Sequence, residues 1–269
     1  PINNPMLWDE FNPNIYEAAA TLEMEGMTDS KCETFGMRKL TNQNALLQIN
    51  NRRLFLRGTL ECCIFPLKGY PPMDEAGWEK VFSAARDYGM NHLRFHSWCP
   101  PEAAFNVADR MGFYIQVELP LWTLNVGEDK GTVDFLYNEA AHIMKEYGNH
   151  PSFCFWSLGN ELQGDFSVMD KLLTTIKQQD SRHLYMTTTF TFEPGHGSWP
   201  EPNDDFWVTQ WTKNGWVRGQ GIFDDQPVSF NKDFSSAIEG LPVPLITHEI
   251  GQYSVFPNLK EIDKYTGNL

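Results

Sequence analysis

The sequence predicts an α/β protein that contains a (β/α)8 barrel, preceded by the remnant of a β-sandwich. From residue 50 onward, short apolar runs typical of buried strands alternate with stretches of helical spacing. Strands that alternate with helices pair in parallel, because each crossover uses a helix. Neither GxGxxG nor GxxxxGK[ST], the turns typical of open nucleotide-binding sheets, occurs. Seven strands within about 200 residues therefore favour a closed barrel over an open sheet.

Residues 1–49 differ from the remainder of the chain. Two strand-like runs, residues 15–22 and 45–49, stand between turn-forming residues. Two or three strands do not form a stable sandwich alone. We therefore interpret the segment either as the C-terminal part of a β-sandwich domain or as strands packed on the domain that follows.

The barrel segment, residues 50–269, predicts elements in the order strand, helix, strand. The expected strands are residues 54–60, 92–96, 113–119, 153–158, 184–190, 206–211 and 245–249, and the expected helices are 75–88, 101–111, 133–147, 166–178 and 231–238. Trp78, Phe82 and Ala85 give the first helix its apolar face. No eighth strand is evident, and we expect the barrel to be cut short rather than completed within residues 250–269.

Glycine and proline support the expected helix ends. Gly89, Gly112 and Gly148 follow three of the predicted helices, where a residue after a helix end often adopts a left-handed conformation. Pro101 stands near the first turn of the second helix, a position where its missing N–H is tolerated. The boundaries of these three helices therefore have support that is independent of apolar spacing.

Composition restricts the classes of partner. The 269 residues are 41% hydrophobic, which is enough for a sizeable core, and their formal net charge is -14. That charge argues against nucleic acid and anionic membrane surfaces, which require basic patches. No run of 18 apolar residues predicts a membrane-spanning helix. No His/Cys cluster has metal-ligand spacing, so neither a metal nor a cofactor is expected.

Polar residues at the ends of the predicted strands are the candidates for chemistry, because barrel enzymes act at the C-terminal ends of their strands. These residues are Glu61, Arg94, His96, Glu118, Asn160, Glu161, Gln210, His248 and Glu249. Carboxylates dominate the set, and no GxSxG motif offers a serine nucleophile.

Two of these strand ends suit the hydrolysis of glycosides. Residues 155–161 read Phe-Trp-Ser-Leu-Gly-Asn-Glu and end in Glu161, whereas residues 245–251 read Leu-Ile-Thr-His-Glu-Ile-Gly and contain Glu249. Desolvation by Trp156 and its neighbours is expected to raise the pKa of Glu161, so that it donates a proton at neutral pH. Strands four and seven face each other across a barrel mouth. One carboxyl group can then protonate a leaving oxygen while the other attacks the anomeric carbon.

The sequence resembles the catalytic barrel of glycoside hydrolase family 2, which includes β-galactosidases, β-glucuronidases and β-mannosidases. The stretches that carry the resemblance are residues 35–38 with 51–58, residues 89–96, residues 149–161 and residues 248–251. The most specific match is NHPS followed by WSLGNE, in residues 149–161. Residues 7–8 and 12–16 resemble the last strands of the family's immunoglobulin-like domain. The resemblance implies a TIM barrel that cleaves a terminal β-linked sugar by double displacement with retention.

The resemblance also implies roles for single residues. Glu161 matches the acid/base and Glu249 the nucleophile, while Asn160 matches an asparagine that binds the sugar 2-hydroxyl. Arg94 matches an arginine that keeps the nucleophile ionised, and His96 matches a histidine that lines a subsite. Flat aromatic faces and strand-end amides suit sugars, and the further expected substrate contacts are Trp98, Trp122, Gln210 and Trp211.

An oligosaccharide or glycoside is therefore the expected partner, and a homo-oligomer is possible. Because the chain begins with Pro1, we expect it to be a piece of a longer product, and the resemblance implies a periplasmic or extracellular location. The family's metal-binding galactosidases carry further ligands after strand three, which residues 118–122 lack. Two alternatives are a non-catalytic carbohydrate-binding barrel and an inactive fragment of such an enzyme. The presence of both glutamates favours the enzyme.

Overall fold

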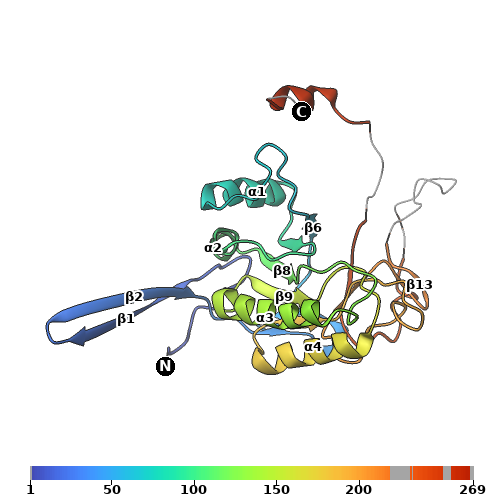
Figure 1. The fold of residues 1–269 in the computed structure, drawn as a ribbon, viewed down its shortest axis with the longest axis horizontal. Coiled ribbons are helices and arrows are strands. Elements are labelled where there is room, and N and C mark those ends of the chain that lie inside the picture. Colours follow the sequence, from blue (N-terminus) through green and yellow to red (C-terminus); the bar gives the residue numbers. More distant parts are fainter. Residues whose placement is uncertain (1, 219–230, 232, 251–255, 267–269) are drawn as a thin grey trace.

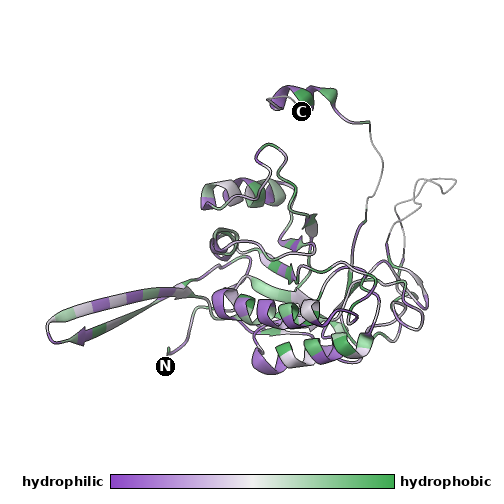
Figure 2. Cartoon of the chain, in the orientation of Figure 1, coloured by the Kyte–Doolittle hydropathy of each residue, from purple (hydrophilic) through white to green (hydrophobic). Residues whose placement is uncertain are grey.

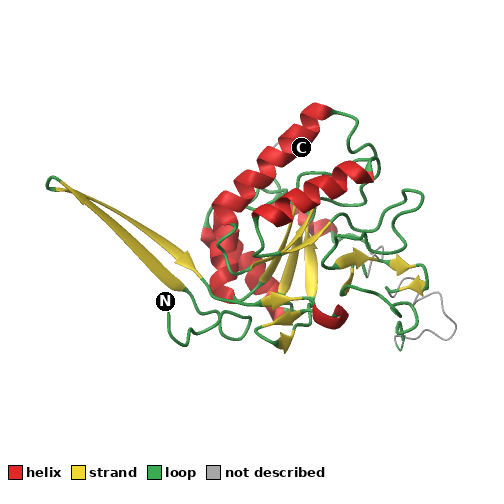
Figure 3. Ribbon diagram, turned by 90° about the horizontal axis from the view of Figure 1, so that it is seen from below, coloured by secondary structure: helices red, strands yellow, loops and turns green. Residues whose placement is uncertain are grey.

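A five-stranded parallel sheet forms the centre of this computed structural model, which describes residues 2–218, 231, 233–250 and 256–266. The strand order is β10-β9-β8-β7-β6, so neighbours along the chain are neighbours in the sheet. Its strands are β6 (Gly58–Glu61), β7 (His92–Phe95), β8 (Tyr114–Glu118), β9 (Phe153–Ser157) and β10 (Leu184–Met186). Helices cover one side of the sheet (Figures 1 and 3). This winding in a single direction is typical of a barrel.

Four helices connect these strands as the sequence predicts. They are α1 (Glu75–Asp87), α2 (Glu102–Met111), α3 (Lys130–Tyr147) and α4 (Phe166–Gln179). Asp74, Asp129 and Asp165 precede α1, α3 and α4, and each carboxylate accepts a hydrogen bond from a backbone N–H of the first turn. The cap at Asp129 explains why α3 begins three residues before the predicted start. None of the helices in the described ranges is long and apolar enough to cross a membrane.

Two further parallel strands continue the series. β11 (Trp207–Thr209) pairs with β14 (Leu245–Thr247), and β11 lies beside β10, since Val208 N donates to Met186 Sδ at 3.0 Å. All seven predicted strands are thus confirmed. Between them, β12 (Trp211–Thr212) and β13 (Gly215–Trp216) form a small antiparallel hairpin. The predicted helix 231–238 is wrong, since residues 235–240 form turns, and η3 (Leu259–Lys264) contains no buried residue.

Several predicted strands are too long, for physical reasons. The first barrel strand begins at Gly58 rather than residue 54, because residues 52–53 form β5 (Arg52–Arg53) in a different sheet. The fifth ends at Met186 because the side chains of Thr188 and Thr189 accept backbone N–H groups of the loop that follows β9. The seventh ends at Thr247, since Glu249 has a φ of 52° that a strand does not accommodate.

The N-terminal 53 residues form two distinct parts. β1 (Tyr16–Met24) and β2 (Met27–Phe35) form a long hairpin that extends away from the barrel, with hydrophilic and hydrophobic residues mixed along it (Figures 1 and 2). β3 (Leu40–Thr41), β4 (Gln48–Ile49) and β5 form a short antiparallel sheet, and η1 (Gln43–Ala45) lies between β3 and β4. Leu47 and Ile49 join one of the two apolar clusters of the barrel. The interpretation as strands packed on the barrel therefore holds for residues 40–53, but not for the hairpin.

The NHPS segment has a structural role that the sequence does not disclose. His150 Nδ1 lies 2.6 Å from a carboxylate oxygen of Asp109, and Ser152 N donates to the other oxygen at 3.0 Å. Asp109 belongs to α2, and its backbone carbonyl accepts the indole N–H of Trp8. The motif therefore fixes the start of β9 against α2 and the N-terminal segment.

Alternation along the strands divides apolar from polar side chains. Leu93, Val117 and Trp156 belong to the cluster that includes the helices, whereas Phe155 and Met186 belong to the second apolar cluster. Near the C-terminal ends, polar side chains occupy the alternate positions and are buried as well. These are Arg94, Gln116, Glu118, Ser157 and His248. Buried polar groups require hydrogen-bond partners, and those partners define the site.

Candidate active site

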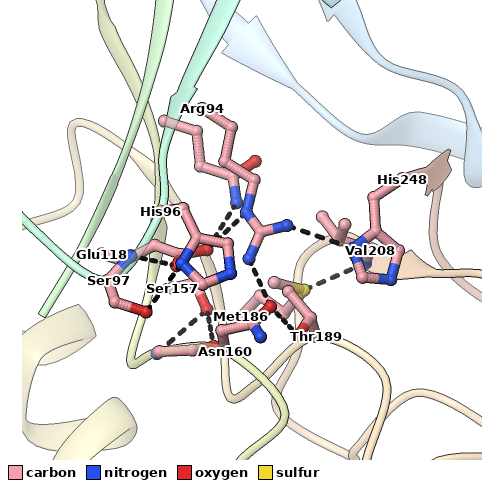
Figure 4. A network of polar contacts seen from close by, with 12 residues as sticks. Arg94, His96, Ser97, Glu118, Ser157, Asn160, Met186, Thr189, Val208 and His248 are labelled. Carbon is pink, nitrogen blue, oxygen red and sulfur yellow. Dashed lines mark hydrogen bonds and ion pairs between the residues drawn. The ribbon is translucent and has the colours of Figure 1, made fainter. Parts of the chain in front are cut away.

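Arg94, at the end of β7, is the centre of a buried polar network (Figure 4). Its Nε donates to Glu118 Oε1 at 2.7 Å, one terminal nitrogen donates to Asn160 Oδ1 at 2.7 Å, and the other lies 3.1 Å from His248 Nδ1. Parallel strands end at the same edge of the sheet, which is why residues from β7, β8, β9 and β14 meet here. Charge-assisted hydrogen bonds of this kind fix the geometry of every partner.

Glu118 is fully buried and its carboxylate accepts three hydrogen bonds. Besides Arg94, Gln116 Nε2 donates to Oε1 at 3.3 Å and Ser97 N donates to Oε2 at 2.7 Å. These donors occupy most of the acceptor sites of the carboxylate, and its 0% exposure keeps the group away from a substrate. Glu118 therefore positions Arg94 and is not available as a catalytic group.

Asn160 and Glu161 are held by the loop that follows β10. Thr189 Oγ1 donates to Asn160 Oδ1 at 2.9 Å and also accepts the Glu161 N–H at 2.9 Å. Asn160 Oδ1 thus receives two hydrogen bonds, which fixes the amide orientation, while its buried Nδ2 has no partner in the described part of the chain. Glu161 adopts a φ of 48°, and in this conformation its carboxyl group lies near the charges of Arg94 and Glu249.

The carboxyl group of Glu161 has the electrostatic character of an acid. Burial, and next the negative charge of Glu249, raise the pKa of Glu161, while the positive charges of Arg94 and Arg218 oppose the change. Both effects penalise the ionised form. The influence of Glu249 means that the two predicted carboxylates, from β9 and β14, lie close enough to interact.

Glu249 is partly buried beside His248 and Arg218. Its carboxylate Oε1 lies 3.6 Å from His248 Nδ1, and its backbone carbonyl accepts a hydrogen bond from Arg218 at 3.0 Å. Burial, and then the charges of Arg94 and Arg218, lower the pKa of His248 to about 2. The imidazole is therefore neutral at any physiological pH.

A comparison with protein families identifies the class of this barrel. Residues 40–190, which are more than half of the chain, match the model of the glycosyl hydrolases family 2 TIM barrel domain. The chain belongs to glycosyl hydrolase family 2. The resemblance in the sequence is confirmed by this match, and so is the barrel domain.

Relatives of the family 2 chain include known glycosidases. It is 26% identical to β-galactosidase 2 of Enterobacter cloacae over 67% of this chain and 18% of the relative. It is 29% identical to a putative β-glucuronidase of Formosa agariphila over 60% of this chain and 20% of the relative. The chain thus spans about a fifth of the length of these curated relatives.

Solved structures agree on the fold. A β-glucuronidase of Parabacteroides merdae superimposes with a TM-score of 0.69 and 22% identity, over 84% of this chain and 28% of that one. A β-D-glucuronidase of Dictyoglomus thermophilum gives a TM-score of 0.67 and 20% identity, over 77% of this chain and 38% of that one. At this identity the likeness concerns the fold alone.

The aromatic residues predicted from the sequence of this family 2 barrel occupy three different environments. Trp122 is 62% exposed and lies edge-on to the half-buried His96. Trp211, which follows the buried Gln210, is 36% exposed and lies beside Trp216. Trp98 differs, because its indole N–H donates to Glu61 O and its ring packs on Trp78 and Phe95. Trp122 and Trp211 thus offer accessible faces, whereas Trp98 supports the wall of the barrel.

Thr189 and Arg218 are functional candidates that the sequence reasoning missed. Thr189 belongs to a threonine-rich run that was interpreted as strand, and Arg218 lies beyond the end of β13, away from any predicted strand end. Glu118 and His248 stood among the strand-end residues, but their contact with Arg94 was not foreseen. Within the described ranges, no group of three or more His, Cys, Asp or Glu side chains is arranged to hold a metal ion.

Proposed function

We propose that this chain carries the catalytic site of a retaining β-glycosidase that removes a terminal β-linked sugar. The observation that carries the proposal is the pair of carboxyl groups at the ends of β9 and β14, where burial and the charge of Glu249 raise the pKa of Glu161. Family membership supports the same chemistry. A carboxyl group of raised pKa beside a second carboxyl group is the arrangement that a retaining mechanism uses.

The mechanism assigns one step to each group. Glu249 attacks the anomeric carbon while protonated Glu161 transfers its proton to the leaving oxygen, which forms a glycosyl ester. Ionised Glu161 then takes a proton from water, and the resulting hydroxide releases the sugar from Glu249 with overall retention. Asn160 offers its unpartnered Nδ2–H to a hydroxyl group of the sugar.

The test uses chemical rescue in the intact protein. A set of aryl β-galactosides, β-glucuronides and β-mannosides first identifies the sugar. Glu249→Ala is expected to abolish turnover, and azide then restores part of it as an inverted glycosyl azide, because azide replaces the missing nucleophile. Glu161→Ala with azide is expected to give the retained azide instead.

The matched control is Glu239→Ala, an exposed carboxylate that none of the described site residues contacts. It is expected to retain wild-type turnover. Full activity of Glu249→Ala would end the assignment. Binding of a glycoside without any product, in the wild-type protein, would favour the carbohydrate-binding barrel instead.

We also propose that the β1–β2 hairpin within residues 1–49 belongs to the C-terminal part of an immunoglobulin-like β-sandwich, whereas residues 40–49 pack on the barrel. In support, the β1–β2 hairpin is exposed on both faces, and one face of β1 presents apolar side chains at Ala18, Ala20, Leu22 and Met24. An isolated two-stranded hairpin is only marginally stable in water. Limited proteolysis of the intact protein is expected to leave this hairpin uncut, because other strands would cover it.

The closure of the barrel is a related proposal. β6 and β14 each pair on one side only within the described residues. A (β/α)8 barrel needs one more parallel strand between them. We propose that sequence beyond residue 269 supplies it, so that the 50–269 segment is an incomplete barrel.

A further inference from the structure

His248 is a buried polar residue for which the mechanism above has no use. It follows the last residue of β14 and its side chain is only 3% exposed. Adjacent side chains of a regular strand point to opposite faces. The positive φ of Glu249 breaks this alternation and leaves His248 Nδ1 3.6 Å from Glu249 Oε1. The imidazole therefore lies on the same side of the chain as the carboxylate that we propose to be the nucleophile.

The hydrogen bond from Arg94 determines the tautomer of His248. A guanidinium N–H can only donate, so Nδ1, at 3.1 Å from Arg94, must accept. Because burial and nearby cations lower the pKa of His248 to about 2, the ring is neutral and carries a single proton. That proton is therefore on Nε2.

The Nε2–H group is buried, and among the residues that the structure describes it has no hydrogen-bond partner. In the imidazole ring it lies on the side turned away from the nitrogen that Arg94 occupies (Figure 4). A buried donor without an acceptor is unfavourable, because it has lost its hydrogen bonds to water. Asn160, whose Oδ1 accepts from the other terminal nitrogen of Arg94, likewise has a buried Nδ2 without a hydrogen-bond partner among the described residues. Arg94 thus orients the side chains of His248 and Asn160, and each side chain retains a donor group that no described residue uses.

We propose that the Nε2–H group of His248 donates a hydrogen bond to an oxygen atom of the sugar bound beside Glu249, an inference that rests on the proposed glycosidase function. His248 is then a substrate-binding residue held in a single tautomer by Arg94. A hydroxyl and a carboxylate of the sugar both offer the acceptor oxygen that this donor requires.

Two substitutions separate this role from a structural one. In His248→Asn the side-chain oxygen can take the place of Nδ1 and accept from Arg94, but the donor at the Nε2 position is lost. In His248→Gln the longer side chain brings its amide nitrogen near the Nε2 position, while the acceptor for Arg94 is lost. The two variants therefore retain opposite halves of the imidazole.

Hydrolysis by the intact protein is measured with 4-nitrophenyl β-galactopyranoside and 4-nitrophenyl β-glucuronide. The proposal predicts that His248→Asn lowers kcat/KM roughly tenfold or more, since one hydrogen bond is lost and its acceptor is left unpaired. His248→Gln is expected to recover part of that loss. A loss confined to the glucuronide identifies a carboxylate as the acceptor, and an equal loss on both substrates identifies a hydroxyl.

The pH profile gives an independent readout. Because His248 is neutral at every working pH, His248→Asn is expected to leave both limbs of the kcat/KM profile in place. A role exerted only through Arg94 would move the limb that belongs to Glu161, and would make His248→Gln the more damaged variant. Either result would overturn the inference.

Binding separates the failure of this inference from the failure of the proposed function. Calorimetry with D-galactono-1,4-lactone and D-glucaro-1,4-lactone does not need turnover. If the wild-type protein hydrolyses nothing, yet a lactone binds and His248→Asn weakens its binding more than His248→Gln does, the function is wrong and the donor role stands. If hydrolysis is normal and both variants bind and react as the wild type does, the donor role is wrong and the function stands.

Discussion

Removal of the Arg94 side chain tests whether the polar network stabilises the barrel as well as the site. Arg94→Met deletes a guanidinium that is 4% exposed and donates to Glu118, Asn160 and His248. Glu118, which is 0% exposed, is then a buried carboxylate without its cation. Breaking a buried ion pair from one side costs about 3–5 kcal/mol. Each kcal/mol lowers Tm by roughly 2–4 °C in a protein of this size, so a fall of roughly 10 °C is expected.

The measurements are thermal unfolding, which gives Tm, and urea-induced unfolding, which gives the free energy, both on the intact protein and followed by tryptophan fluorescence. Glu118→Gln in the Arg94→Met background is expected to recover part of the loss, because the buried charge is removed. The new amide can donate to Gln116 Oε1, which has no partner at present. If Arg94→Met costs less than about 1 kcal/mol, or if the two changes are additive, the ion pair does not have the role assigned to it.

Three further predictions concern the loops around the acid. Thr189→Val removes the hydroxyl that contacts Asn160 and the Glu161 N–H. It is expected to lower kcat/KM roughly tenfold and the free energy of unfolding by about 1–3 kcal/mol. Wild-type kinetics would contradict this prediction. Arg218→Met removes a positive charge that lowers the pKa of Glu161, so Glu161 stays protonated to higher pH. The alkaline limb of the kcat/KM profile is therefore expected to shift to higher pH, and an unchanged pH–rate profile would contradict this. Glu161→Gly is expected to abolish turnover yet raise the free energy of unfolding by about 1 kcal/mol, because glycine adopts the left-handed backbone conformation without strain. A lower free energy of unfolding in urea would show that the backbone of Glu161 is not strained.

Periodicity predicts the centres of the elements better than their ends. α1 to α4 were foreseen within a few residues, because apolar spacing is regular there and a glycine follows each of the first three helices. The end of the predicted strand 184–190 was not foreseen, because the hydroxyls of Thr188 and Thr189 accept hydrogen bonds from the loop after β9. Those hydrogen bonds join residues 26 and 28 positions apart, and no local pattern discloses them.

The candidate site shows the same division between local and long-range information. Glu161 and Glu249 stand out in the sequence because each ends an apolar run, and the barrel rule assigns functional importance to such positions. The contacts of Arg94 depend instead on strand register, which places Arg94 opposite Gln116 and brings Glu118 within reach. Arg218 had no signal at all, since its proximity to the site comes from the course of the loop after β13.

Backbone strain adds an argument for function that neither sequence nor family supplies. Glu161 and Glu249 both have positive φ, and so does Ser97, whose N–H donates to Glu118. A left-handed conformation costs an L-residue about 1–2 kcal/mol, and asparagine or glycine would avoid most of that cost. This cost is present after β7, β9 and β14, at three residues near Arg94. At Ser97 the conformation directs the N–H toward Glu118, and at Glu161 and Glu249 it is accompanied by a carboxyl group near Arg94. Stability alone would favour other residues at these positions, so the strain is consistent with the catalytic roles that we propose for Glu161 and Glu249.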